Sequence, residues 1–376
     1  MRRARWAPVF LSLLLLVALL GGLIANDRPL IMSSGGQLRF PVWSSASISD
    51  GYDEAVDWAI YAPISYGAGR TDLGGSAYLP PLSRGADGGL HWLGTDRLGR
   101  DTAAGLVAGT RLAVLVGLGS LAIALLLGVP LGAISGFYGD RGLRVPAYGY
   151  WALVLGLVLG IGYGVASVLP LTRPSGVGWL LVLVTVGLVM GATWLLLRVM
   201  SQRLKWLRRS VGLPLDRCVL MLLELSASVP GLIVMIVVLA LVERPSMGVV
   251  ILVLGVLGWT SVARYLRAEL LRIRELPYIA AARVSGVGGW RLLVVHALPN
   301  ALGPLSVVAA FLVGSSILAE AALSFLGIGV PADTVTWGSL LRQSRAQPTA
   351  WWLAVFPGLM LTFTVLACNS LRKAAE

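Results

Sequence analysis

Few side chains in this sequence have the types and spacing that chemistry requires. The chain holds two histidines, His91 and His296, and two cysteines, Cys218 and Cys368. They show no metal-ligand or disulfide spacing, and no nucleophile, zinc-protease or phosphate-binding P-loop motif occurs. The sequence therefore predicts no catalytic residue, no metal site and no cofactor-binding residue in this chain.

Two carboxylates, Glu224 and Glu320, fall inside apolar runs. Carriers coupled to protons or sodium use such carboxylates to bind the ion near the membrane midplane. We expect Glu224 near the inner end of its helix and Glu320 in the outer half of its own. Both are interpreted as helix-end or interhelical polar contacts, so the energy source is expected outside this chain.

The composition is that of an integral membrane protein. The 376 residues are 57% hydrophobic and 13% charged, and the mean hydropathy is +0.81. A spanning helix needs about 20 apolar residues. The candidate runs are Ala7 to Ala25, Leu112 to Ile134, Ala147 to Leu169, Val177 to Leu197, Cys218 to Val242, Met247 to Ala263, Ala301 to Leu326 and Trp351 to Ala367. The first run is longer than a typical signal core, so we expect a retained anchor.

The basic residues predict the orientation. With the N-terminus inside, most of them fall in the inner segments, which are residues 1–6, 140–146, 198–217, 264–300 and 368–376. The short outer loops hold only Arg173, Arg244, Arg342 and Arg345. By the positive-inside rule both termini are expected in the cytoplasm, and the net charge of +12 needs no nucleic-acid partner.

A long external segment, residues 26–110, separates the first two runs, and we assign no strand or helix to it. It ends in "HWLGTDRLGRD". Asp101 or Thr102 is expected to cap a helix that begins at Ala103. Farther along, glycines spaced by four allow two helix backbones to approach closely. These glycines are Gly128, Gly132 and Gly136.

The inner segment 264–300 is the most unusual part of the chain. Pro277 fits the first turn of a short helix, and Gly286 fits the left-handed position that ends one. The helix between them would present Ala280, Ala281 and Ala282, flanked by Tyr278 and Arg283. A soluble partner could push on this small-residue surface; a helix that only lies on the membrane is the alternative.

This segment resembles the cytoplasmic EAA loop of ABC-importer permeases. Ala281, Ala282 and Gly286 match that motif, and Leu298 with Pro299 matches its ending. Ala280 stands where the family normally has glutamate. "HWLGTDRLGRD", with Gly94, Thr95, Asp96, Gly99, Arg100 and Asp101, and the last third of the chain resemble the dipeptide/oligopeptide branch. "GLIANDRPLI" is most similar to the microcin-C-type peptide permeases.

The resemblance implies an all-α polytopic fold, a type I ABC-importer core of six helices. The two predicted helices beyond these six are then expected to be an insertion into the core. The expected division is an N-terminal anchor over 1–25, the external segment over 26–110, a first core helix over 111–139, the inserted pair over 140–212 and the rest of the transport domain over 213–370. The tail lacks the family's usual extension of aspartates and glycines.

The resemblance also implies the function and the partners. The chain would be the permease subunit of a peptide importer in the bacterial inner membrane. Its partners would be a second homologous permease, two ATP-binding cassette subunits that bind ATP and magnesium, an external substrate-binding protein, the peptide and membrane lipid. The residues expected to contact the ATPases are Tyr278, Ala280, Ala281, Ala282, Arg283 and Gly286. A stand-alone channel or ion-coupled carrier and a non-transporting scaffold subunit stay open as alternatives.

Overall fold

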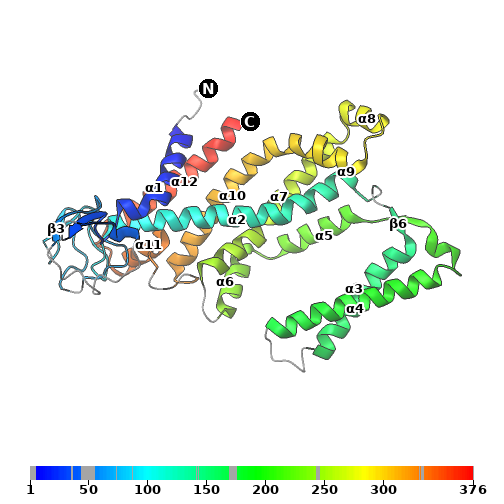
Figure 1. Cartoon of the computed structure of the whole chain (residues 1–376), viewed down its shortest axis with the longest axis horizontal. Helices are drawn as coiled ribbons and strands as arrows, with labels where there is room; N and C mark the ends of the chain where they lie inside the picture. The colour runs from blue at the N-terminus through cyan, green and yellow to red at the C-terminus, as the bar shows by residue number, and fades with distance from the viewer. Residues whose placement is uncertain are drawn as a thin grey trace.

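A computed structural model describes residues 6–34, 37–43, 56–72, 74–86, 88–140, 142, 144–168, 176–242, 246–329, 331 and 334–375. In this part of the chain the fold is mostly helical, with short strands near one end (Figure 1). Six arginines used in the orientation argument lie outside the described residues. They are Arg2, Arg3, Arg5, Arg141, Arg173 and Arg244.

Seven described helices are long and apolar enough to span a membrane. They lie in α1 (Trp6–Ile24), α2 (Thr102–Tyr138), α3 (Ala147–Val168), α4 (Gly176–Met200), α7 (Met247–Ile273), α10 (Leu298–Leu326) and α12 (Trp352–Ala375). An eighth candidate span is the pair α5 (Leu215–Ser228) and α6 (Gly231–Leu241). Each predicted apolar run therefore corresponds to one span, and the all-α polytopic fold is confirmed.

The eighth span is bent rather than straight. Helices α5 and α6 meet at an angle of 78°. Pro230 lies in the break, and proline both lacks a backbone donor and clashes with the preceding helical turn. The apolar run predicted from Cys218 to Val242 is thus helical in both halves and bent between them.

Helices α2 and α7 form the central packed pair. A Cβ atom at Gly128, Gly132 or Gly136 would lie within 2.8 Å of the α7 backbone, at the carbonyl oxygens of Trp259, Ala263 and Arg267 respectively. The three glycines therefore set how closely the two helices approach. The predicted close approach is an intramolecular contact.

The external segment has more structure than its sequence predicted. Strands β1 (Ile31–Ser34), β2 (Gln37–Arg39) and β3 (Val56–Ile60) form an antiparallel sheet in the order β2-β1-β3, and η1 (Pro41–Trp43) follows β2. Strands β4 (Ser83–Arg84) and β5 (Leu90–His91) form a second ribbon. Helix α2 begins at Thr102, so the last residues of the predicted external segment are helical.

Helices α3 and α4 form a hairpin that extends to one side of the other helices (Figure 1). A two-stranded ribbon joins its base to α2 and α5. This ribbon pairs β6 (Arg144–Pro146) with β7 (Ser210–Gly212), and the short helix η3 (Lys205–Arg208) packs against α3. The close contact of α3 with α4 runs along Gly156, Gly160 and Gly164, whose missing side chains admit α4 residues.

The C-terminal third closes the bundle. Helix α11 (Trp337–Ala346) starts with a capping box at Thr336 and Ser339 and packs between α10 and α12. Glu320 of α10 is buried and accepts a hydrogen bond from the Ser324 hydroxyl. Glu224 is exposed on α5 near the α5/α6 bend.

Candidate functional sites at the two ends of the membrane helices

A short helix, α8 (Pro277–Val284), forms at the predicted inner segment. Pro277 occupies its first turn, and Gly286 follows it with φ +82°, the left-handed region that favours glycine. Figure 1 shows α8 at the opposite end of the molecule from β3. The sequence therefore predicted this helix and both of its boundaries correctly.

One face of α8 is anchored in the bundle. Ile279 is fully buried in an apolar cluster with Phe137 of α2, with Leu266, Leu270 and Ile273 of α7, and with Ala301 of α10. Ala282, one turn along α8, packs against the same cluster. The apolar cluster therefore joins α8 to three spanning helices.

The other face of α8 is open. Tyr278 is 41% exposed and Val284 is 90% exposed, while Ala280, Ala281 and Arg283 are also exposed. Trp290 of α9 (Gly289–Arg291) adds a large aromatic ring that is 67% exposed. Exposed apolar side chains among cations are typical of a surface that binds another protein.

The chain after α8 differs from the prediction. A π-helical segment, η4 (Leu292–Ala297), runs directly into α10, so the helix begins before the predicted start at Ala301. Asn300 of α10 donates from Nδ2 to the Tyr278 hydroxyl over 3.2 Å and to the His296 carbonyl over 2.7 Å. This links α8 directly to α10.

A polar cluster joins the C-terminal ends of α2 and α7 to the start of α5. Asp216 of α5 accepts two hydrogen bonds from the Arg267 guanidinium and one from the Ser135 hydroxyl at 2.6 Å. Arg274, just after α7, pairs with Glu275 over 3.1 Å. These contacts occupy Arg267 and Arg274, whereas Arg283 makes no hydrogen bond or ion pair with the described residues.

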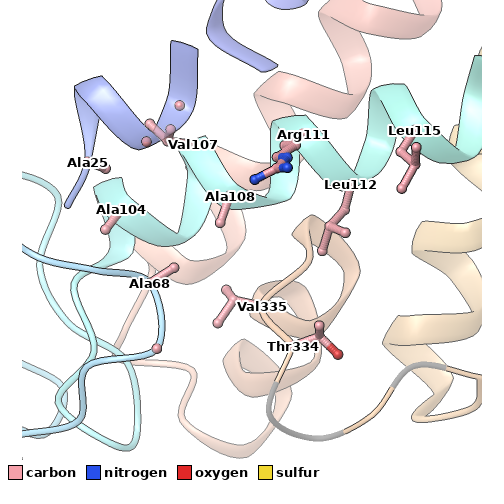
Figure 2. Close-up of a pocket in the computed structure, with 13 residues that line it drawn as sticks. Ala25, Ala68, Ala104, Val107, Ala108, Arg111, Leu112, Leu115, Thr334 and Val335 are labelled. Atoms are coloured by element: carbon pink, nitrogen blue, oxygen red, sulfur yellow. The ribbon is translucent and has the colours of Figure 1, made fainter. Parts of the chain in front are cut away.

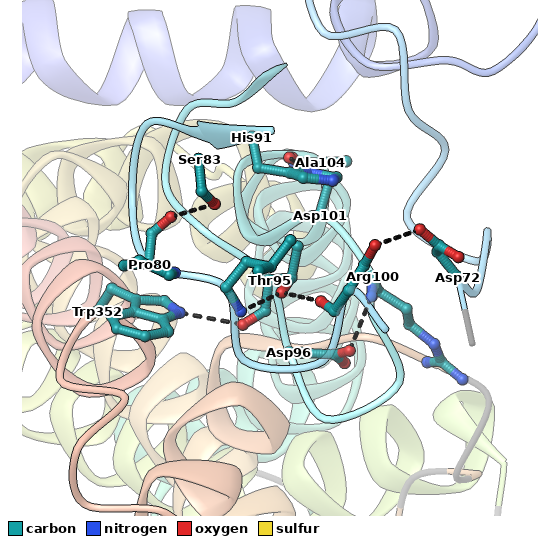
Figure 3. A network of polar contacts seen from close by, with 12 residues as sticks. Asp72, Pro80, Ser83, His91, Thr95, Asp96, Arg100, Asp101, Ala104 and Trp352 are labelled. Carbon is teal, nitrogen blue, oxygen red and sulfur yellow. Dashed lines mark hydrogen bonds and ion pairs between the residues drawn. The ribbon is translucent and has the colours of Figure 1, made fainter. Parts of the chain in front are cut away.

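The predicted external motif folds into a tight turn at the opposite end of α2 (Figure 3). Asp101 is the N-cap of α2, because its Oδ1 accepts from the backbone N–H of Ala104 at 2.8 Å. Its Oδ2 lies 2.8 Å from Nδ1 of His91, and both side chains are buried. The Tyr66 ring stacks on His91 with centroids 4.4 Å apart.

Thr95 and Asp96 fasten this turn to the rest of the molecule. Thr95 donates its hydroxyl to the Ser76 carbonyl, and the Thr95 carbonyl accepts from Trp352 Nε1 at 3.0 Å. Asp96 accepts from the backbone N–H groups of Leu98 and Arg100, and from Gln343 at 3.2 Å. The turn thereby joins the start of α2 to α11 and α12.

The two glycines of the motif are required by this turn. Gly94 and Gly99 have φ +78° and +70°. A side chain at Gly94 would meet the Leu79 carbonyl and Trp352, and one at Gly99 would collide with the Asp72 backbone. Asp72 also accepts from the Ser76 hydroxyl and the Gly74 N–H, which hold the pKa of its carboxyl below its ordinary value.

The external motif is therefore a brace whose acidic groups point inward, and Thr95, Asp96 and Asp101 are all buried. Sequence reasoning missed His91, Trp352 and Gln343 as parts of it. The motif's own spacing predicts the cap at Asp101 but carries no signal for a contact to Trp352, which lies 257 residues beyond Thr95.

An open cleft of about 480 Å³ lies beside this brace, between α1, the first turns of α2 and residues 334–335 (Figure 2). Small side chains form much of its wall, including those of Ala25, Ala68, Ala104 and Ala108. Arg111 is the one charged side chain among the residues that line it. The cleft therefore offers one cation and the Thr334 hydroxyl among mostly apolar side chains.

Comparison with known proteins gives a family match and a similar solved structure. Residues 204–375 match the family described as binding-protein-dependent transport system inner membrane component. The solved structure of the MetNI methionine ABC transporter in inward-facing conformations is similar, with a TM-score of 0.40 and 15% identity, over 72% of this chain and 95% of that one.

Three of the curated proteins to which the chain is similar are each named as permeases. The di/tripeptide transport system permease protein DppC of Pseudomonas aeruginosa is 30% identical over 74% of this chain and 67% of its own length. The peptidoglycan transport system permease protein YejE of Agrobacterium fabrum is 26% identical over 100% of this chain and 90% of its own. The inner membrane ABC transporter permease protein YejE of Escherichia coli is 27% identical over 100% and 93%. The chain thus belongs to the inner-membrane permease subunits of binding-protein-dependent ABC transport systems, multi-pass proteins that transport rather than catalyse.

Proposed function

We propose that this chain forms half of the translocation pathway of an ATP-driven importer of peptides or peptide-like molecules. The peptide assignment is supported by its relatives, which are named for di/tripeptide and peptidoglycan transport. Family membership favours this function over a stand-alone channel or an ion-coupled carrier, because such systems work with separate ATPase and substrate-binding subunits. A second homologous permease would supply the other half of the pathway.

The observation that carries the proposal is α8. The exposed residues of α8 between Tyr278 and Arg283 would dock on a cytoplasmic ATP-binding cassette subunit. The buried side chain of Ile279 holds the opposite face of α8 in the bundle. ATP and magnesium would be bound by two such subunits, since the sequence has no P-loop. Ala280 supplies no carboxylate, so docking would depend more on Tyr278, Arg283 and the backbone, or the second permease would carry the stronger anchor.

Coupling would follow from unequal binding of the ATPases to two states of the permease. A partner that binds both states equally shifts neither. When the ATPases close on ATP, they would pull α8, and the cluster around Ile279 would pass this movement to α2, α7 and α10. The paired permeases would then change from inward-open to outward-open.

The proposed orientation places both termini and α8 in the cytoplasm. The bias of basic residues toward the inner segments supports it. The strands β1 to β5 and the brace at Gly94 to Asp101 would then face outward, toward the substrate-binding protein. The anchor over 1–25 and the insertion over 140–212 are proposed as additions to a six-helix core.

The decisive test is reconstitution of the complete complex in proteoliposomes, with the binding protein outside. Uptake of a labelled tripeptide should require ATP inside and should stop when the P-loop lysine of the ATPase is replaced. A muropeptide probe tests the cell-wall substrate named in the Agrobacterium relative. Peptide uptake that persists without ATP would reject the proposed function.

A further inference from the structure

We propose that the base of the α3–α4 hairpin is a binding surface for the headgroups of anionic phospholipids. This surface, called the basic collar here, comprises Arg144, Arg198, Arg203, Lys205, Arg208 and Arg209. The basic collar lies within residues 140–212, and its proposed role does not depend on which substrate the transporter carries.

The charge of the insertion is one-sided. Between Asp140 and Asp216 the sequence contains no acidic residue but eight basic ones. Six of the eight lie within the described residues, and all six are at the base of the hairpin. Orientation by the positive-inside rule requires only an excess of basic residues. This segment also lacks any acidic residue whose carboxylate could neutralise them.

The collar is free to bind a ligand. All six of its side chains are exposed, and none makes an ion pair with an acidic residue in the described part of the chain. Nearby Asp140 is already paired with Arg217 over 3.2 Å. An external anion is therefore the remaining partner for these cations.

The collar is held in a fixed shape. Leu207 is 1% exposed and anchors η3, while the Ala147 N–H donates to the Arg209 carbonyl at 2.8 Å. The ribbon of β6 and β7 holds Arg144 on the adjacent strand. Cations from β6, from the end of α4 and from the segment around η3 thus lie together at the base of the hairpin.

Aromatic side chains place the collar at the membrane surface. Trp206, between Lys205 and Leu207, is 52% exposed, and the Arg198 guanidinium lies 4.8 Å from the centroid of the Trp194 ring. Tryptophan prefers the level of the lipid headgroups, and basic clusters next to a spanning helix attract anionic lipids. The collar follows directly on the last turn of α4, where such headgroups lie.

The hairpin's surroundings favour lipid over a protein partner. Its helices contact each other extensively and make few contacts with the core, and their outer faces carry exposed apolar residues such as Val158, Leu183 and Leu188. The base lies at the same end of the molecule as α8 but on a separate element (Figure 1). Acyl chains can cover the hairpin faces while headgroups meet the collar.

The test is native mass spectrometry of the full-length chain, titrated in detergent with phosphatidylglycerol or, separately, with phosphatidylethanolamine. The wild type should bind phosphatidylglycerol more tightly. Each cation near an anionic surface contributes about fivefold, so Lys205→Gln with Arg208→Gln should weaken phosphatidylglycerol binding by about 25-fold. Binding of phosphatidylethanolamine should not change.

Two further variants complete the design. Arg264→Gln with Arg291→Gln removes two exposed cations elsewhere, and should preserve phosphatidylglycerol binding. Lys205→Arg with Arg208→Lys keeps both charges and should also preserve it. Equal affinities for the two lipids, or equal losses in the collar and control variants, would overturn the proposal and leave an acidic protein surface as the partner.

Discussion

The Asn300 side chain donates to the Tyr278 hydroxyl over 3.2 Å, so the proposed ATPase-docking helix is hydrogen-bonded to the helix that follows it into the membrane. An exposed neutral hydrogen bond contributes at most about 1 kcal/mol. Tyr278→Phe keeps the ring and removes this link. We expect peptide uptake per ATP hydrolysed to fall by up to about fivefold.

A double-mutant cycle checks this interpretation. Asn300→Leu removes this bond and also the bond to the His296 carbonyl, so its loss should be at least as large as that of Tyr278→Phe. Adding Tyr278→Phe to Asn300→Leu should produce little further loss, because the bond between the two residues is already absent. Copurification with the ATPases should change little in all three, because Tyr278→Phe keeps the aromatic ring that is proposed to contact the ATPase. Fully additive losses would mean that the two residues act separately.

The surface formed by Arg283 and Gly286 is expected to bind the ATPase. Arg283→Glu reverses an exposed charge, and Gly286→Leu forces a branched side chain into a left-handed backbone that costs about 1–2 kcal/mol. Each should reduce ATPase copurification and uptake by about tenfold or more. Arg264→Glu, also exposed but on α7, is the matched control. Unchanged copurification would contradict docking at this position.

Ala280 offers a gain-of-contact experiment. Ala280→Glu restores the carboxylate of the family motif on an exposed face of α8. A charge-assisted hydrogen bond contributes about 1.5–3 kcal/mol, so affinity for the ATPases should rise by about tenfold or more if a donor faces this position. Ser285→Glu places the same charge beyond the end of α8 and should not raise it. Binding of purified ATPase to nanodisc-embedded permease measures both.

Asp101 should matter for stability because it both caps α2 and pairs with buried His91. Asp101→Ala should destabilise the fold by about 2–4 kcal/mol, since a cap is lost and a buried polar group is left without its partner. Asp101→Asn, which keeps the capping oxygen, should cost less. Asp140→Ala, which removes exposed contacts with the Arg217 guanidinium and backbone N–H, should lower the thermal unfolding midpoint less than Asp101→Ala.

The α2–α7 contact predicts a contrast between two glycines. A Cβ at Gly132 would lie 2.7 Å from the Ala263 carbonyl oxygen, whereas nothing lies within 4 Å of one at Gly191 on α4. Gly132→Leu should therefore destabilise the protein by about 1–3 kcal/mol, and Gly191→Leu by much less. Thermal unfolding in detergent compares them. Equal effects would show that α2 and α7 can separate without cost.

Local signals predicted much of this structure from the sequence. Hydropathy located every candidate span among the described residues, because the length of an apolar run is set by the thickness of the bilayer. Pro277 and Gly286 predicted both ends of α8, because each has a backbone preference that does not depend on distant residues. Asp101 as the cap of α2 followed from the same kind of short-range chemistry.

Contacts between distant residues could not be predicted in this way. The bond from Trp352 to Thr95 and the pairing of β1 with β3 depend on how the whole chain folds. The bend between α5 and α6 also lay within an apolar run that hydropathy treats as continuous. The sequence located the external motif, but its role as a brace became visible only with its remote partners.

The ribbon of β6 and β7 closes the two ends of the α3–α4 hairpin onto each other. Arg144 and Gly212 are paired across it, so their Cα atoms are about 5 Å apart although nearly seventy residues of chain separate them. Removal of the residues between them would leave two chain ends that a short turn can join. The rest of the chain could then keep its path.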